Sequence, residues 1–270
     1  MKKFAFIGLL ALVIGGLGTI FHWDQLFDLG KSEEENVRKS IEAEHIEKII
    51  IESDLAEINF YQTDSEQIDI YFSKTGSSRI EEIFTIDQSG ETLEMTVDHG
   101  SRFFKFSFIN ISFLNQEVTL NIGIPNLFSG SIEAETNLGH IKLNNLELDQ
   151  FSGIVDVGNI KGENITLNKG RAVTNVGEID LAMVTGEWYL KSDVGELNLA
   201  LLDWQGEIEA HSDIGDITIQ LPAEPEQYTL RLETELGDII PSPYINTNNS
   251  QGPRLTATSD IGDIEIQWRD

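Results

Sequence analysis

The sequence predicts an all-β protein, a single-stranded β-solenoid with about 20 residues per coil preceded by an N-terminal transmembrane helix. Three observations predict it: a glycine motif that recurs at a nearly constant interval, alternation of polar and apolar residues without a helical period, and one apolar run near the N-terminus. A flatter antiparallel repeat sheet or sandwich would fit the same alternation, and it is the alternative architecture.

The apolar run at residues 4–21 is uncharged, rich in Leu, Ile, Ala and Gly, and preceded by Lys2 and Lys3. Its 18 residues just span a hydrocarbon core, so we expect residues 1–23 to form a signal-anchor in the cell membrane. No small-residue cleavage pair follows Phe21, which disfavours a removed signal peptide. The positive-inside rule predicts a cytoplasmic N-terminus and an extracytoplasmic C-terminal domain. A buried helix of a soluble protein is the alternative.

The formal charge of the chain is −28, from 46 acidic and 18 basic residues, and the first 30 residues sum to zero. Nucleic acid is therefore excluded as a partner, because phosphate binding needs a basic surface. Anionic lipid headgroups should also repel the acidic part. The charge could attract divalent cations or basic peptides, but solubility is its simplest explanation. There is no cysteine, which excludes disulfides, thiolate metal sites and a Cys nucleophile.

Two regions lie between the anchor and the glycine repeats. Residues 24–45 are predicted to be a charged juxtamembrane spacer, with a short helix or solvated segment at 31–45. Residues 46–130 are predicted to be an N-terminal β region, either a cap or irregular first coils, and we expect one continuous body with the repeats. Its strands are expected at 46–53, 57–63, 67–75, 91–100 and 117–125.

Residues 131–270 are predicted to form the solenoid repeats, because the pattern [Asn/Asp/Glu]-[Leu/Ile/Val]-Gly-x-[Ile/Leu] occurs seven times there. Consecutive motif glycines are 18 to 25 residues apart, and a fainter copy at 53–58 has Ala56 at the glycine position. No coil could bury its aliphatic residues alone, so stacking is required. The structural repeat glycines are Gly139, Gly158, Gly177, Gly195, Gly215, Gly237 and Gly262.

Each motif glycine is expected to supply a positive φ or a close backbone approach at a corner, with the polar residue two positions earlier capping the turn. The aliphatic residues on either side of the glycine are expected to form two interior ladders. The first ladder is Leu138, Val157, Val176, Val194, Ile214, Leu236 and Ile261, and the second is Ile141, Ile160, Ile179, Leu197, Ile217, Ile239 and Ile264. Secondary turns are expected midway, at Gly153, Gly170, Gly186 and Gly206.

Stacking could also gather carboxylates into a calcium site, since calcium takes six to eight oxygen ligands. Asn137 and Asn175 interrupt the ladder, and the G-G-x-G-x-D repeat of calcium-binding solenoids is absent from the sequence. Turn-capping carboxylates are the favoured interpretation, so no metal or cofactor is expected, with Ca²⁺ as the open alternative. The residues concerned are Asp156, Asp193, Asp213, Glu235 and Asp260 before the glycines and Asp216, Asp238 and Asp263 after them.

Enzymatic activity is not expected, and no catalytic or cofactor-binding residue is assigned. The five histidines, at 22, 45, 99, 140 and 211, share no ligand spacing, and no nucleophile-elbow, zinc-protease or phosphate-loop motif occurs. Repetition spreads residue types evenly, whereas catalysis needs a unique cluster. Four aromatic residues discriminate between functions, because exposure in a groove would favour sugar binding and burial would favour scaffolding. They are Trp188, Tyr189, Trp204 and Trp268.

The chain resembles the bacterial "putative adhesin" family of membrane-anchored envelope proteins, which includes LiaG-like proteins encoded beside cell-envelope stress-response systems. The resemblance is carried by the anchor at 4–21, the segment VTLNIGIP at 118–125 and the S-D-[Ile/Val]-G-[Asp/Glu]-[Ile/Leu] copies, and it covers most of residues 46–270. It implies an extracytoplasmic interaction or scaffold protein linked to envelope stress, whose partner is an envelope protein or cell-wall polymer. An adhesin-like module that binds wall polymer or other cells is the alternative, and a carbohydrate-active enzyme is the third possibility.

Overall fold

The computed structural model describes residues 34–75, 79–98, 117–240 and 252–269, which belong to one compact unit. The anchor predicted at 4–21 lies outside these residues. Within the described ranges, no helix has the length and apolar character needed to cross a membrane.

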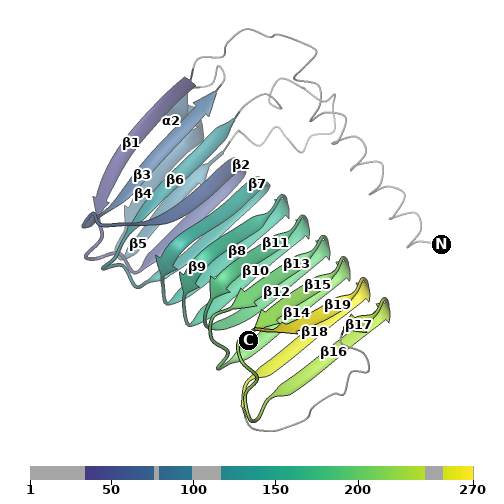
Figure 1. Cartoon of the computed structure of the whole chain (residues 1–270). Coiled ribbons are helices and arrows are strands. Elements are labelled where there is room, and N and C mark those ends of the chain that lie inside the picture. Colours follow the sequence, from purple (N-terminus) through teal and green to yellow (C-terminus); the bar gives the residue numbers. More distant parts are fainter. Residues whose placement is uncertain (1–33, 76–78, 99–116, 241–251, 270) are drawn as a thin grey trace, which may run out of the picture. The chain divides into compact units, whose positions relative to one another are not determined.

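The described residues form a stack of coils that each contain two strands, one before and one after the motif glycine (Figure 1). β7 (Ser131–Glu147) runs through its bend and supplies both strands of the first repeat coil. The first strands of the later coils are β8 (Gln150–Val157), β10 (Lys169–Val176), β12 (Glu187–Val194), β14 (Glu207–Ile214), β16 (Thr229–Leu236) and β18 (Arg254–Ile261). The second strands are β9 (Ile160–Thr166), β11 (Ile179–Val184), β13 (Leu197–Leu201), β15 (Ile217–Leu221), β17 (Ile239–Ile240) and β19 (Ile264–Trp268).

Every described pairing between these repeat coils is parallel, and equivalent motif positions face each other. Val157, Val176 and Val194, for example, are matched across β8, β10 and β12. An antiparallel repeat sheet or sandwich would require antiparallel pairs at these positions. The repeats are therefore an all-β parallel solenoid with two strands per coil, as the spacing of the glycines predicts.

The order of the coils in the stack departs from their order in the sequence at the C-terminal end. β18 lies between β14 and β16, and β19 lies between β15 and β17 (Figure 1). The chain therefore builds the outermost level first and returns to fill the level beneath it. This exchange of levels accounts for the longer spacings between motif glycines after Gly215.

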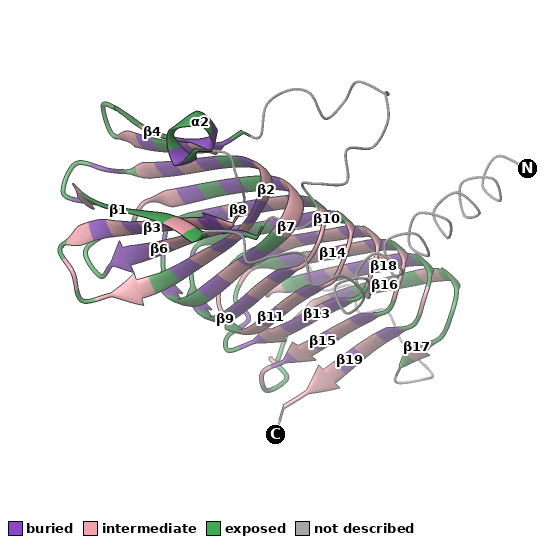
Figure 2. Ribbon diagram, turned by 90° about the horizontal axis from the view of Figure 1, so that it is seen from above, coloured by how far each residue is buried: buried purple, intermediate pink, exposed green. Residues whose placement is uncertain are grey.

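Burial alternates along each strand, so that one face of both layers packs into a shared core (Figure 2). The second predicted ladder occupies this core, since six members are buried and Ile239 at the outer level is half-buried. The prediction for the first ladder is wrong. Five members are only half-buried at the corner, while Leu236 and Ile261 are 66% and 41% exposed. The bend turns these side chains outward, and the residue two positions earlier enters the core instead, a buried Ser or Thr in five coils and Val155 in β8.

Two glycines predicted to form turns lie inside strands. Gly153 is in β8 beneath the ring of Phe151, and Gly170 is in β10 beneath the ring of Trp188. A Cβ atom on Gly170 would lie 2.3 Å from the indole, so this glycine makes room for the tryptophan of the next coil. Gly186 and Gly206 do lie in turns, as expected.

The N-terminal region extends both layers of the stack. β2 (Lys48–Thr63) is a complete coil in register with β7, and its Ala56 faces Gly139, which places the faint motif copy in the repeat series. Beyond it, β5 (Thr92–Val97) pairs with the first half of β2 and with β4 (Phe84–Ser89), which the short helix α2 (Ile80–Ile83) precedes.

The second half of β2 pairs with β6 (Val118–Pro125), and the layer continues through β3 (Gln67–Thr75) to β1 (Glu34–Glu42). Since β1 pairs with β3 over nine residues, the prediction of a short helix or solvated spacer at 31–45 is wrong for residues 34–42. Their charged side chains misled that prediction, because a strand at a sheet edge can expose nearly all of its side chains.

Candidate functional site

The glycine corners form a continuous ridge along the stack. The seven motif glycines have φ between 143° and 159°, a region that L-residues rarely adopt. At Gly177 a Cβ atom would lie 1.9 Å from the carbonyl oxygen of Gly158, one coil away. Glycine is therefore needed at these corners for two reasons: the positive φ and the close contact with the neighbouring coil.

Buried hydroxyl groups tie each corner to its neighbour. Ser192 donates to the Gly177 carbonyl oxygen (3.1 Å), Thr174 to Gly158 (3.0 Å) and Ser259 to Gly215 (3.1 Å). These residues stand three positions before their own glycines and are 0–3% exposed. The Ser or Thr of the motif is thus a structural residue that the sequence analysis missed, although its recurrence in the quoted motif copies was a visible signal.

The residue after four of the motif glycines accepts a backbone N–H of the adjacent level, whereas capping was expected from the polar residue two positions before each glycine. The Asn159 N–H donates to Nδ1 of His140 (2.9 Å), and the Glu178 N–H donates to Oδ1 of Asn159 (3.0 Å). In the same way, the Asp263 N–H donates to Oδ1 of Asp216, and the Asp238 N–H donates to Oδ1 of Asp263. Because partial burial disfavours the imidazolium, the pKa of His140 is lowered from its ordinary value, an effect that Lys142 and Lys161 reinforce and Glu57 opposes.

The carboxylates considered for calcium lie along this ridge, and several of them bind neighbouring side chains or backbone N–H groups. Asn175 donates to Asp156 (2.9 Å) and Asn137 to Asp54 (3.1 Å), so the asparagines relieve repulsion between stacked acids. Lys191 binds Asp193 at 2.5 Å, and this hydrogen bond raises the pKa of Lys191. Over the described parts of the chain, no group of three or more His, Asp or Glu residues is arranged to hold a metal ion.

The discriminating aromatic residues are mainly interior. Trp188 and Trp204 are 2% and 3% exposed, and the half-buried Trp268 packs against Trp204 and Tyr228. Tyr189 is half-buried on the outer face beneath Arg171. This placement favours scaffolding at these four positions over a sugar-binding groove.

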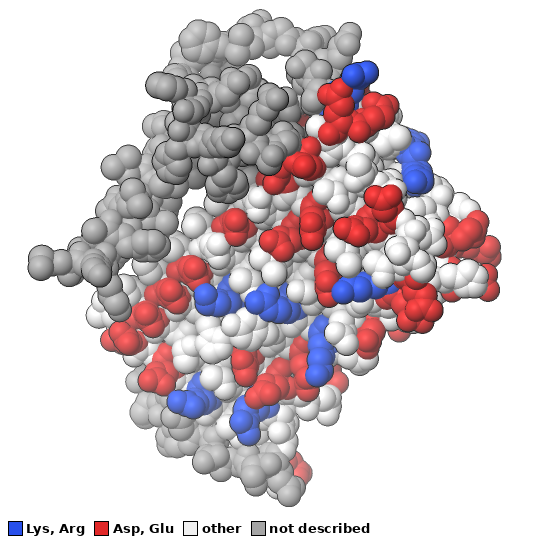
Figure 3. All heavy atoms as spheres, turned by 180° about the vertical axis from the view of Figure 1, so that it is seen from behind, with Lys and Arg blue, Asp and Glu red and all other residues white. Residues whose placement is uncertain are grey.

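On the face shown in Figure 3, acidic side chains are spread over the surface with Lys and Arg interspersed among them. Several bases form ion pairs with residues of adjacent levels, including Lys142 with Glu57 at 2.7 Å and Lys161 with Glu178 at 3.1 Å. The hydrogen bond from Lys142 lowers the pKa of Glu57. The repeat surface is therefore polar and internally paired.

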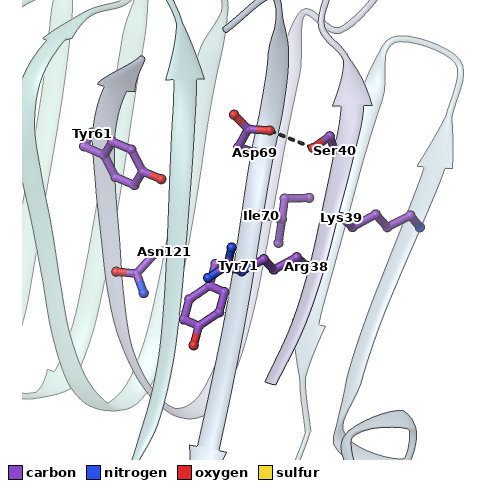
Figure 4. Close-up of a pocket in the computed structure, with 8 residues that line it drawn as sticks. All are labelled: Arg38, Lys39, Ser40, Tyr61, Asp69, Ile70, Tyr71 and Asn121. Atoms are coloured by element: carbon purple, nitrogen blue, oxygen red, sulfur yellow. Dashed lines mark hydrogen bonds between the residues drawn. The ribbon is translucent and has the colours of Figure 1, made fainter. Parts of the chain in front are cut away.

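The N-terminal extension carries a groove of about 620 Å³ on its outer face (Figure 4). Two of its lining residues, Tyr61 of β2 and Asp69 of β3, flank the buried Gly123 in the sheet register. A Cβ on Gly123 would lie 3.3 Å from the Tyr61 ring and from Cβ of Asp69, so the glycine lets the tyrosine ring lie close over the sheet. The groove is lined by Arg38, Lys39, Ser40, Tyr61, Asp69, Ile70, Tyr71 and Asn121.

Polar contacts hold the groove side chains in place. Ser40 donates to Asp69 (2.7 Å), and Asn59 donates to the side-chain oxygen of Asn121 (3.1 Å). The guanidinium of Arg38 lies 4.9 Å from the centre of the Tyr71 ring. Sequence reasoning did not find this site, because β1 was predicted to be a helix or spacer and its pairing with β3 could not be foreseen.

Solved structures of similar fold come from several bacteria. A "putative adhesin" of Bacteroides fragilis has a TM-score of 0.50 and 14% identity, over 86% of this chain and 97% of that chain. A "putative cell adhesion protein" of Clostridium sporogenes has a TM-score of 0.43 and 15% identity, over 88% and 100%. A "putative lipid binding protein" of Parabacteroides distasonis has a TM-score of 0.41 and 13% identity, over 88% and 97%. At these identities the likeness concerns the fold alone.

No curated protein matches the chain. The Toastrack DUF4097 family model matches twice, over residues 46–184 and 171–267, and so spans the N-terminal β region and the repeats. The resemblance to the "putative adhesin" family is confirmed by this match, and the fold agrees with that of the Bacteroides fragilis structure. The chain belongs to the Toastrack DUF4097 family.

Proposed function

We propose that the protein is a non-enzymatic interaction protein of the bacterial cell envelope, held at the membrane by residues 4–21 with its β domain outside the cytoplasm. The observation that carries the proposal is the stack itself, in which equivalent positions match across levels and several surface charges pair between adjacent levels. Such a body offers long rigid faces to a partner. The proposed link to envelope stress rests on the family resemblance described above.

A non-enzymatic role is supported by the groove as well as by the repeats. Among the described residues that line it, Asp69 is the only carboxylate, and it already accepts a hydrogen bond from Ser40. Glycoside hydrolysis generally needs two carboxyl groups on opposite sides of the scissile bond. This lining therefore favours binding over hydrolysis, and it disfavours the carbohydrate-active enzyme.

An adhesin-like module that binds wall polymer is the second candidate function. The groove favours it, because exposed aromatic and amide side chains surround a hollow large enough for a small ligand. The similar Bacteroides fragilis structure is named a "putative adhesin", which agrees with this candidate.

The test combines crosslinking of the full-length protein in native membranes with sedimentation of the solubilised protein on purified cell wall. We expect specific crosslinks to an envelope protein, or retention by the wall, or both. Crosslinks alone would favour the scaffold, and retention alone would favour the adhesin-like module. Absence of both would refute the proposed function.

A further inference from the structure

We propose that the groove between β1, β3, β6 and β2 is a binding site for an uncharged oligosaccharide. The inference rests on the proposed interaction function and names the ligand class for one site. Its volume of about 620 Å³ lies within the range of about 300–1,000 Å³ that is usual for small-ligand sites.

Sheet register places the two walls of the groove. Tyr61, Gly123 and Asp69 occupy matched positions on adjacent strands, so their side chains would project from the same face. The central position has no side chain, and the flanking Tyr61 is 41% exposed. One wall of the hollow is therefore an aromatic ring and the other is a carboxylate, as Figure 4 shows.

The chemistry of the walls matches that of a sugar ring. A pyranose presents C–H groups on its faces, which pack against aromatic rings, and hydroxyl groups at its edge, which need donors and acceptors. Tyr61 and Tyr71 supply the rings, and Asp69 supplies acceptors. Asn121 accepts from Asn59 through its oxygen, so its amide nitrogen remains a donor. All these side chains come from strands, whose hydrogen-bonded register fixes their positions.

Charge favours an uncharged ligand. The guanidinium of Arg38 lies over Tyr71, and Asp69 lies on the neighbouring row, so both signs border the groove. The chain carries a net charge of −28, which repels polyanions such as nucleic acids and anionic wall polymers. An oligosaccharide of hexose or N-acetylhexosamine units has no net charge and gains from both donors and acceptors.

The experiment titrates the full-length protein with neutral hexose and N-acetylhexosamine oligomers, using calorimetry in a detergent without a sugar headgroup. We expect at least one oligomer to bind saturably with Kd below about 1 mM. Tyr61→Ala should weaken that binding by about tenfold or more, since it removes the stacking surface, whereas Tyr61→Phe should stay within about threefold. Gly123→Val should also weaken binding by about tenfold or more, because a side chain there would meet the Tyr61 ring and displace it.

Tyr189→Ala is the control, because Tyr189 is also a strand tyrosine on an outer face but does not line the groove. Binding by this variant should equal that of the wild type, and thermal unfolding should confirm that each variant is folded. No binding by the wild type, or equal binding by folded Tyr61→Ala, would overturn the groove assignment. If wall retention or crosslinks nevertheless persist, the proposed interaction function stands without the groove.

Discussion

The repeats and the N-terminal extension follow different rules within one stack. From β7 onward each level repeats the contacts of the level before it, so a residue type that suits one coil suits the next. In the extension only β2 follows the repeat, and β1, β3 and β4 make antiparallel pairs. The groove lined by Tyr61, Asp69 and Tyr71 occurs in the extension. Repetition yields rigidity and an even surface, and a unique site requires a departure from it.

Substitution of a motif glycine tests this rigidity most severely. Gly177→Val should lower the free energy of unfolding by about 3 kcal/mol or more, since it combines an unfavourable φ with a Cβ overlapping the Gly158 carbonyl oxygen. Gly90, in the β4–β5 turn, is the control because its φ is 61° and a Cβ atom there would meet no other atom within 4 Å. Gly90→Ala should cost only about 1 kcal/mol. Equal costs in urea denaturation would contradict the role of coil-to-coil contact.

The buried hydroxyl groups give a second comparison between the regions. Ser192→Ala should cost about 1–2 kcal/mol, because it removes the hydrogen bond to the Gly177 carbonyl oxygen in the core. Ser53 occupies the matching position of β2, and its buried hydroxyl has no hydrogen-bond partner among the described residues. Ser53→Ala should leave thermal stability unchanged or slightly increased. A larger loss for Ser53→Ala than for Ser192→Ala would show that the ladder contributes little.

Substitution of Met183 offers a way to stabilise the repeats. A positive φ between 51° and 57° recurs near the end of the second strand on three successive levels, at Asn145, Asn164 and Met183. The side chain of Asn164 donates a hydrogen bond to that of Asn145. Asparagine tolerates this conformation better than methionine does. Met183→Asn should therefore raise the free energy of unfolding by about 1 kcal/mol, while Met183→Leu should not. If chemical denaturation shows no increase in the free energy of unfolding for Met183→Asn, the ladder of asparagines ends at Asn164 for another reason.

The smallest expected effect is a dependence of stability on pH through His140, which lies in β7 where the two regions meet. The folded protein lowers the pKa of His140 from 6.5, so the unfolded chain takes up a proton more readily. This contribution to stability is present above the unfolded value and is lost as the pH falls below it. His140→Asn keeps an acceptor for the Asn159 N–H, as Asn159 does for Glu178. The variant should lose less stability than the wild type between about pH 7.5 and 5.5, measured by thermal unfolding, because the shifted group is gone. An identical loss would exclude His140 as the cause.

Much of the coil could be predicted because one constraint is visible in the sequence. Glycine is required where φ is positive and a neighbouring carbonyl lies within contact distance, and this requirement recurs once per coil. The interior could be predicted only in part, since alternation does not say which way a side chain turns at a corner. Val176 and Thr174 illustrate this, because the apolar residue is half-buried and the polar residue is fully buried.

The groove and the exchanged levels could not be predicted from the sequence for a related reason. Both depend on which strands pair, and the strand motifs are interchangeable. Leu236 and Ile261 stand at equivalent motif positions, so nothing local says which coil lies outermost. Similarly, the charged sequence of residues 34–42 carries no sign that it will pair with β3.

The exchanged order of the last two coils has a consequence for how the chain folds as it is made. β16 pairs with β18 and with no other described strand, so its place in the sheet exists only after Arg254–Ile261 has been synthesised. Earlier levels can add one at a time as the chain emerges, since each pairs with a level that precedes it. A chain that stops before β18 therefore lacks the strand on which the level of β16 is built.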